Sequence, residues 1–166
     1  TRDHYRVGVK RQHLIVSLGL DTSFTGKLDP NYIRNAHAIP RATKLIGIVG
    51  RLAPIKNHRL FIKAALKCIQ TDPMQDAIFV VIGDGDPEYV NSLKSIASGQ
   101  KRVIFTGLIE SPEKIYGGLD LLVLTSINEG TPLTILEAFA SKVPVISTRV
   151  GGVEDLIGKN EERGTY

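Results

Sequence analysis

Short runs of apolar residues alternate along this chain with longer segments in which apolar residues recur at every third or fourth position. The short runs are rich in Val, Ile and Leu and predict buried strands. They lie at Lys44–Val49, Ala77–Ile82, 102–106, Leu121–Leu124 and 144–147. The segments between them predict helices. This strand–helix alternation predicts an α/β fold, a Rossmann-like, doubly wound parallel sheet covered on both faces.

The predicted helices begin at residues that suit helix starts. Asn57 fits an N-cap, while Asp86-Pro87 and Ser111-Pro112 each pair a capping residue with a proline suited to the first turn. The helix after Asn57 has one apolar face made of Leu60, Phe61, Ala64, Ala65, Cys68 and Ile69. The next helix turns four apolar residues inward, Val90, Leu93, Ile96 and Ala97. Gly117-Gly118 ends the helix after Pro112, and Gly151-Gly152 precedes a last short one.

The first part of the chain lacks this regular pattern. Residues 13–18 form a short strand-like run, and residues 21–44 contain Gly26, Pro30 and Pro40 with neither a helical nor a strand period. A structureless loop of that length is unusual inside a compact domain. We therefore predict an interdomain segment or linker over residues 1–43 and an α/β domain over residues 44–166.

The turn Asn128-Glu129-Gly130 follows the fourth predicted strand and leads into a helix. Thr131 fits the N-cap of that helix and Pro132 its first helical position. The segment Leu133–Ala140 is apolar on nearly every side except at Glu137, so we expect it to be buried. Helical side chains lean toward the N-terminus, which lets Glu137 point at the same opening as Glu129.

The N-terminus of this helix predicts a ligand that carries both phosphate and hydroxyl groups. Unpaired backbone N–H groups and the positive end of the helix dipole favour an anion such as phosphate. Two carboxylates would repel a phosphate, but they suit the hydroxyls of a sugar and a ribose. The alternative is that Glu129 is a solvated loop acid and that Glu137 is a buried acid satisfied by a neighbouring Arg or backbone N–H. Their spacing around one helix N-terminus favours the binding role.

Arg51 and Lys56 follow the first predicted strand and supply the positive charge that such a site needs. One helix N-terminus contributes only about 0.3–2 kcal/mol to anion binding. Micromolar affinity requires about 8 kcal/mol. A diphosphate would therefore need Arg51 as a planar fork and Lys56 as a point charge. The alternative is that both are solvated surface charges.

Glycine-containing turns follow the predicted strands, at Gly50, Gly83-Asp84-Gly85, Gly107, Gly130 and Gly151-Gly152. In parallel sheets, ligands bind beyond the carboxyl ends of the strands, so this shared placement predicts a ligand site at that edge. Residues 107–110 can present backbone groups to a flat base, and ordinary turns are the alternative there and at 83–85. The sequence has no G-x-G-x-x-G after the first strand and no P-loop lysine motif.

Composition narrows the classes of function. The chain has 166 residues, 42% of them apolar, a formal charge of +4 and a pI near 9.2. The net positive charge favours anionic ligands or a membrane surface. Because this charge is scattered along the chain, it argues against nucleic acid as a partner. No apolar run approaches the ~20 residues of a membrane span. Cys68 is the one cysteine, which excludes an internal disulfide, and the four histidines are not spaced as ligands of a metal.

Taken together, these residues resemble the C-terminal, nucleotide-sugar-binding half of a family 4 (group 1) glycosyltransferase. That family comprises retaining enzymes with two facing Rossmann-like domains, the GT-B fold. Glu129, Glu137 and the seven residues between them are similar to the family's E-x7-E motif. The resemblance covers most of the chain, through 16–21, 49–52 with Lys56, 83–85, 105–107, 128–133, 137–140, 144–146 and Gly151-Gly152.

The resemblance implies roles for individual residues. Arg51 and Lys56 would neutralise the diphosphate and stabilise the leaving group without a metal ion, and Glu129 would contact the transferred sugar. Glu137 would hold the ribose hydroxyls, and residues 107–110 would contact the base. The other implied positions for binding the nucleotide sugar are Gly50, Gly83, Gly107, Leu108, Gly130, Thr131, Pro132 and Leu133.

The resemblance also implies an activity. A hexose-type sugar would pass, with retention, from a nucleotide-diphosphate sugar, expected to be a UDP-sugar, to a glycan or lipid-linked acceptor, without a cofactor. The acceptor would bind the family's N-terminal half, which this chain lacks, and a last strand and closing helices are also missing. The chain alone is therefore expected to bind its substrate weakly and not to turn over.

The same resemblance suggests a role in polysaccharide biosynthesis of the cell envelope. We expect a cytoplasmic location, with peripheral association at the inner face of the membrane. The alternatives are a sugar-nucleotide epimerase or a phosphorylase of the same architecture, and a non-catalytic nucleotide-binding domain. The two enzymes would need acid–base groups or a pyridoxal-phosphate lysine in the missing half.

Overall fold

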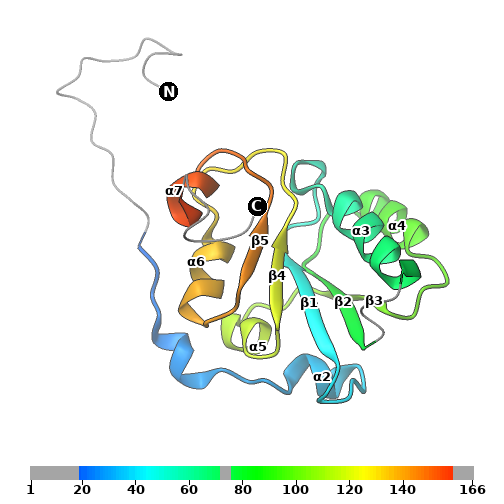
Figure 1. The fold of residues 1–166 in the computed structure, drawn as a ribbon, viewed down its shortest axis with the longest axis horizontal. Helices are drawn as coiled ribbons and strands as arrows, with labels where there is room; N and C mark the ends of the chain where they lie inside the picture. Colours follow the sequence, from blue (N-terminus) through cyan, green and yellow to red (C-terminus); the bar gives the residue numbers. More distant parts are fainter. Residues whose placement is uncertain (1–18, 72–75, 159–166) are drawn as a thin grey trace, which may run out of the picture.

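The structure is a computed structural model that describes residues 19–71 and 76–158. Its centre is a five-stranded sheet with the strand order β3-β2-β1-β4-β5 (Figure 1). Every neighbouring pair of strands is parallel. The strands are β1 (Lys44–Val49), β2 (Ala77–Ile82), β3 (Val103–Gly107), β4 (Leu121–Leu124) and β5 (Val145–Ser147). The predicted Rossmann-like α/β fold is confirmed, and the strand bounds differ by one residue at β3 and β5.

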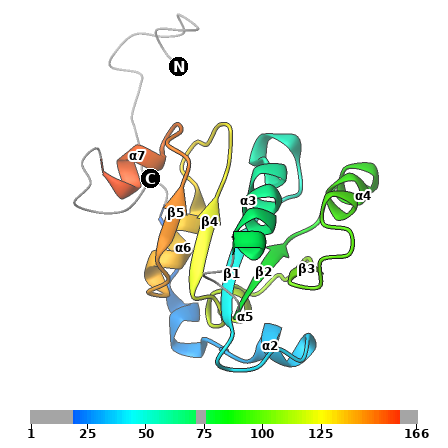
Figure 2. The ribbon, with the colours of Figure 1, turned by 45° about the vertical axis from the view of Figure 1, so that its right-hand side comes forward.

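Helices cover both faces of this sheet. In Figure 2, α3 and α4 lie on one side of the strands, and α5 and α6 lie on the other. The longer helices are α3 (His58–Thr71), α4 (Pro87–Ile96) and α6 (Leu133–Ala140). The short ones are η2 (Ser23–Lys27), α2 (Tyr32–Ala36), η3 (Pro54–Lys56), α5 (Pro112–Tyr116) and α7 (Val153–Ile157).

The central strands β1 and β2 are buried on both faces, which is why they read as nearly continuous apolar runs. Alternate residues of β1 point to opposite sides, as strand geometry requires. Leu45 and Val49 join the core beneath α5 and α6, whereas Ile46 and Ile48 join the core beneath α3 and α4. The sheet therefore separates two apolar layers.

The order of the strands places the loops that matter for function. The chain runs from β1 to β2 and β3 on one side, then crosses back to lay β4 against the other side of β1. The carboxyl ends of β1 and β4 therefore lie next to each other at the point where the order reverses. In open α/β sheets this switch point is the usual place for a ligand.

Several predicted helix details need correction. Helix α6 begins at Leu133, with Pro132 in the N-cap position and no side-chain capping bond, so Thr131 is not the cap. The helix is not wholly buried either, because Leu133 is 43% and Phe139 40% exposed. By contrast, Asp86 caps α4 as predicted, accepting bonds from two backbone amides of its first turn.

The apolar face of α3 also differs from the predicted one. Leu60 is 44% exposed and Ala64 is exposed, whereas Phe61, Ile62 and Ala65 are buried against the sheet. Asn57, which the sequence suggests as the N-cap of α3, has φ 50 and ψ 44, in the left-handed region. Its carbonyl accepts a hydrogen bond from the amide of Leu60.

The segment before β1 is more structured than its sequence predicts. It contains η2 and α2, and Ile33 and Ile39 are buried in the core beneath α5 and α6. Arg34 donates to the carbonyls of Pro40 and Thr43 and forms an ion pair with Asp120. Residues 23–27 and 32–36 are therefore helical, although the sequence there shows no helical period. The predicted strand at 13–18 lies outside the described residues, and the interdomain boundary stays a prediction.

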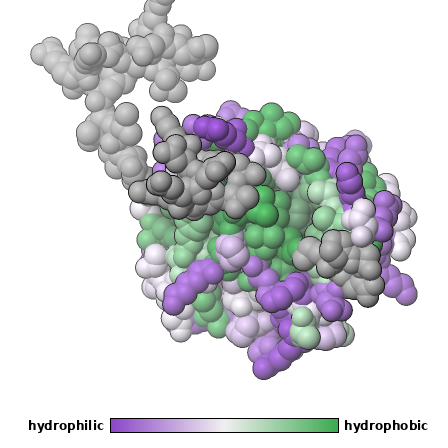
Figure 3. Space-filling model, in the orientation of Figure 1, coloured by the Kyte–Doolittle hydropathy of each residue, from purple (hydrophilic) through white to green (hydrophobic). Residues whose placement is uncertain are grey.

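The visible surface of the molecule carries both apolar and polar side chains. In Figure 3, apolar side chains gather in the middle of the visible face, and polar side chains lie along its lower and right-hand edges. Within residues 19–71 and 76–158, no helix combines the length and the apolar character that crossing a membrane requires.

Candidate functional site

The loops after β1 and β4 are joined by hydrogen bonds at the switch point of the sheet. The buried Thr125 hydroxyl donates to the carbonyls of Lys56 at 3.2 Å and Asn57 at 3.0 Å. The backbone amide of Ile127 donates to the carbonyl of Ile55 at 2.8 Å. These bonds fix the backbone that carries Lys56 relative to the backbone that carries Glu129.

The structure brings the predicted cation and the predicted sugar-binding acid into direct contact. The Nζ of Lys56 lies 2.6 Å from Oε1 of Glu129, and the Ser126 hydroxyl donates to the same oxygen at 2.6 Å. The Glu129 side chain is only 8% exposed and that of Lys56 is 27% exposed. The solvated-acid alternative for Glu129 is therefore wrong, since a carboxylate this buried depends on its partners.

Glu137 has a different partner, which comes from helix α5. The Tyr116 hydroxyl donates to Oε2 of Glu137 at 2.7 Å. Burial, followed by the negative charge of Glu137 and by this bond, raises the pKa of Tyr116, so the phenol remains a donor. Among the described residues, the partner of this acid is thus neither an Arg nor a backbone N–H. That Glu137 faces the same opening as Glu129 stays a prediction.

Two of the predicted glycines let neighbouring loops of the protein approach each other closely. A Cβ on Gly83 would lie 2.0 Å from the carbonyl oxygen of Gly50, and one on Gly151 would lie 1.9 Å from that of Glu129. At these two positions the close approach is between neighbouring loops of the protein. By contrast, a Cβ on Gly107 or Gly130 would meet no atom within 4 Å, so open space lies beside both.

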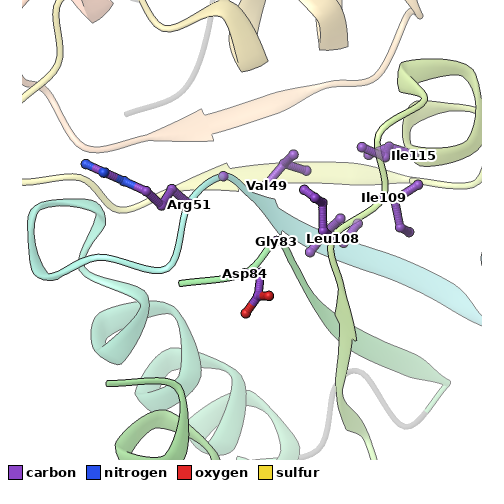
Figure 4. Close-up of a pocket in the computed structure, with 9 residues that line it drawn as sticks. Val49, Arg51, Gly83, Asp84, Leu108, Ile109 and Ile115 are labelled. Carbon is purple, nitrogen blue, oxygen red and sulfur yellow. The ribbon is translucent and has the colours of Figure 1, made fainter. Parts of the chain in front are cut away.

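A pocket of about 280 Å³ lies at the carboxyl ends of β1 and β2, beneath the turn that follows β3 (Figure 4). It brings together four of the predicted residues, Gly50, Arg51, Gly83 and Leu108. The other lining residues are Val49, Ile82, Asp84, Ile109 and Ile115. The pocket therefore combines an apolar floor with a glycine-lined edge.

The two ends of this pocket differ in chemistry. Figure 4 shows the apolar side chains of Leu108, Ile109 and Ile115 gathered at one end, with Arg51 extending away from them at the other. Lys56 does not line the pocket, but its Cε lies 4.0 Å from the place that a Cβ would occupy on Gly50, which does line it. Such an arrangement suits a ligand with a flat apolar part and an anionic part.

The remaining predicted residues, which include Thr131, Pro132 and Leu133, do not line the pocket. Pro132 is buried, whereas Thr131 and Leu133 are exposed. In the part of the chain that the structure describes, no group of three or more His, Cys, Asp or Glu side chains could hold a metal ion. Metal independence remains a prediction.

Sequence reasoning missed three residues of this region, Tyr116, Ser126 and His58. Ser126 lies three residues before Glu129, a spacing that could have suggested contact, but no local pattern links Tyr116 to Glu137. His58 is fully buried, and neither ring nitrogen has a hydrogen-bond partner among the described residues. Burial, and then the positive charge of Lys56, lowers the pKa of His58 from 6.5 to about 4, so its ring is neutral at pH 7.

Comparison with known proteins gives a consistent picture. The model of a family described as "Glycosyl transferases group 1" matches residues 43–165. A curated relative from Escherichia coli, UDP-Gal:alpha-D-GlcNAc-diphosphoundecaprenol alpha-1,3-galactosyltransferase, is 35% identical over 130 residues, which are 76% of this chain and 33% of that protein. The chain thus spans about a third of the length of such relatives.

Solved structures of glycosyltransferases are also similar to this chain. The C-terminal domain of a glycosyl transferase group 1 family protein, LpcC from Francisella tularensis, is 30% identical with a TM-score of 0.72, covering 89% of this chain and 78% of that one. Anabaena Alr3699/HepE, solved in complex with UDP-glucose, is 24% identical with a TM-score of 0.75, covering 89% of this chain and 41% of that one. The latter likeness shows a shared fold.

Proposed function

The chain belongs to the group 1 glycosyl transferases, as a C-terminal domain of the GT-B fold, and from this premise we propose that it binds the nucleotide sugar of a retaining hexosyltransferase. The observation that carries the proposal is the buried contact of Lys56 and Ser126 with Glu129, beside a pocket that is apolar at one end and borders Arg51 at the other. The base would occupy the apolar end, and the diphosphate would lie between Arg51 and Lys56.

The Lys56–Glu129 pair explains how one site can hold both a phosphate and a sugar. An ammonium group has three N–H donors, so Lys56 can keep one bond to Glu129 and turn the others to a phosphate. Glu129 can in turn accept a hydroxyl of the sugar. The pair therefore spans the bond that breaks in sugar transfer.

The chemistry that follows is electrostatic. When the glycosidic bond to the diphosphate breaks, negative charge develops on the leaving phosphate. Arg51, which lines the pocket, and Lys56, whose side chain lies near Gly50, are cations that can stabilise it. Preorganised charge of this kind usually accounts for much of an enzyme's rate enhancement.

The identity of the substrates rests on the relatives. The Anabaena protein was solved with UDP-glucose, and the Escherichia coli relative is named for a UDP-sugar and a diphosphoundecaprenol-linked acceptor. On this support we extend the proposal to a UDP-hexose and a lipid-linked glycan acceptor in cell-envelope biosynthesis. The enzyme would act in the cytoplasm, peripherally at the membrane.

The chain spans only about a third of its curated relatives, so we assign the acceptor site to the remainder of such proteins. On that reasoning the chain alone binds the nucleotide sugar and does not transfer it. Retention of configuration is part of the proposal and would be read from the anomer that the whole enzyme produces.

Ligand-observed NMR with UDP-glucose, GDP-mannose and ADP-glucose tests the proposal directly. We expect selective binding of the UDP-sugar, weakened at least about tenfold by Lys56→Ala, because a charge-assisted bond to phosphate is lost. Lys63→Ala is the matched control, because Lys63 is an exposed lysine on α3. If the folded chain binds none of the three ligands, or if both variants weaken binding equally, the proposed site is wrong.

A further inference from the structure

Two buried hydroxyl groups hold the two carboxylates of the candidate site. The Ser126 hydroxyl donates to Oε1 of Glu129 at 2.6 Å, and the Tyr116 hydroxyl donates to Oε2 of Glu137 at 2.7 Å. Ser126 and Tyr116 are each 1% exposed, so water cannot easily replace either donor. Short bonds from buried hydroxyls to carboxylates are among the strong hydrogen bonds of proteins.

Each bond leaves one carboxylate oxygen unoccupied. Lys56 and Ser126 both donate to Oε1 of Glu129, and no donor within residues 19–71 and 76–158 reaches its Oε2. In the same part of the chain, Tyr116 takes Oε2 of Glu137 and leaves Oε1 without a donor. A carboxylate can accept about four hydrogen bonds, so each unoccupied oxygen can receive a ligand hydroxyl.

We infer that Ser126 and Tyr116 are positioning residues, which fix Glu129 and Glu137 so that the unoccupied oxygen of each accepts a hydroxyl of the bound nucleotide sugar. Ser126 acts through Glu129 on the sugar, and Tyr116 acts through Glu137 on the ribose. This inference rests on the proposed function and adds to it two residues that contact neither substrate part themselves.

The surroundings show that both donors are themselves held in place. The hydroxyl of Thr148 donates to the carbonyl of Ser126 at 2.7 Å, which ties the loop after β4 to the end of β5. Tyr116 belongs to α5, which packs against α6, the helix that carries Glu137. Both hydroxyls are therefore fixed by the fold before a ligand arrives, as preorganisation requires.

Ser126 matters most once the ligand is bound. In the structure Glu129 has two donors, Lys56 and Ser126. A diphosphate beside Lys56 would share the ammonium with Glu129, whereas the Ser126 hydroxyl donates to Glu129 alone and keeps it oriented. Loss of the Ser126 hydroxyl should therefore affect binding of the sugar part rather than of the nucleotide part.

The Ser126 arm of the test compares UDP with UDP-glucose, whose difference is the sugar. We expect Ser126→Ala to weaken UDP-glucose about fivefold and to leave UDP binding unchanged. Ser147→Ala is the matched control, because Ser147 is also a buried serine in this region, 3% exposed, and its hydroxyl donates to the Thr148 carbonyl instead. A merely structural role for Ser126 would weaken both ligands alike.

The Tyr116 arm compares UDP with 2′,3′-dideoxy-UDP, whose difference is the pair of ribose hydroxyls. We expect Tyr116→Phe to weaken UDP about fivefold and dideoxy-UDP not at all. The wild-type chain gives an independent measurement that needs no variant. If it binds dideoxy-UDP as tightly as UDP, Glu137 accepts no ribose hydroxyl and the role assigned to Tyr116 is overturned.

The outcomes separate this inference from the proposed function. If the wild-type chain binds neither UDP nor UDP-glucose, both are overturned. If it binds both while Ser126→Ala and Tyr116→Phe, shown to be folded by thermal melting, bind as the wild type does, the proposed function stands and the positioning roles are overturned. Selective loss in each arm supports them.

Discussion

His58 should make this protein unusually sensitive to mild acid. Its ring is fully buried, neither nitrogen has a partner in the described part of the chain, and burial together with the nearby Lys56 lowers its pKa from 6.5 to about 4. An unfolded chain exposes the ring and restores the ordinary pKa. As the pH falls from 6.5 toward 4, the unfolded state therefore binds a proton that the folded state does not bind, and the free energy of unfolding decreases.

The size of this effect follows from the two pKa values. With 6.5 in the unfolded state and about 4 in the folded state, His58 should lower the free energy of unfolding by about 2 kcal/mol between pH 7 and pH 5. The full effect, reached below pH 4, is about 3 kcal/mol. Small domains are stable by only about 5–15 kcal/mol, so such a change is readily measured.

Urea unfolding followed by circular dichroism at pH 7, 6 and 5 would measure it. The comparison is with His58→Leu, which replaces the ring by an apolar side chain of similar volume that cannot take up a proton. We expect the variant to gain about 2 kcal/mol relative to the wild type between pH 7 and pH 5. Carboxylates titrate in both proteins and cancel in that difference.

Two results would refute the reasoning. One is that the wild type and His58→Leu lose stability in parallel between pH 7 and pH 5. The other is an NMR titration that places the pKa of His58 in the folded chain near 6.5, since the ring would then have a partner or access to water that the structure does not show.

Three further predictions concern stability and binding. Gly151→Ala should lower the free energy of unfolding in urea by about 2 kcal/mol or more, because its Cβ would lie 1.9 Å from the carbonyl oxygen of Glu129. Gly130→Ala should lower it by under about 0.5 kcal/mol, because no atom lies within 4 Å of its Cβ, and similar costs for the two variants would contradict the packing described. Burial alone would raise the pKa of Asp120, but the amide of Leu45 and the cations Lys44 and Arg34 lower it overall. Asp120→Asn should therefore lower the free energy of unfolding by about 1 kcal/mol at pH 7, and this difference should disappear as the carboxylate is protonated in acid; a loss that persists at pH 2 would oppose this account. Leu108→Ala should leave the melting temperature unchanged, because Leu108 is 65% exposed. It should weaken UDP binding about fivefold in a calorimetric titration, because Leu108 lines the apolar end of the pocket. Unchanged binding would show that the base does not occupy this pocket.

Short helices and exposed faces mark the limits of what the sequence could predict. Helices η2 and α2 have five residues each, too few to show a 3.6-residue period, so their segment looked like a linker. In α6 the apolar composition predicted burial on every side. Burial also depends on neighbours, and Leu133 and Phe139 lie on sides of the helix that are only partly covered.

The sequence by itself determined the features that depend on near neighbours in the chain. The apolar runs determined the strands, and Asp86 with Pro87 determined the start of α4, because a strand and a capped helix each depend on about ten consecutive residues. It also provided the chemical groups of the candidate site, a lysine after the first strand and two acids around the last long helix. It did not determine which groups would meet.

Tertiary structure decided the partners through the order of the strands. Lys56 and Glu129 are 73 residues apart, and they touch because β4 packs beside β1 rather than beside β3. The same return of the chain brings Tyr116 of α5 against Glu137 of α6. The physical reason is that strand order depends on how whole apolar layers pack on both faces of the sheet, and no local pattern of residues records that choice.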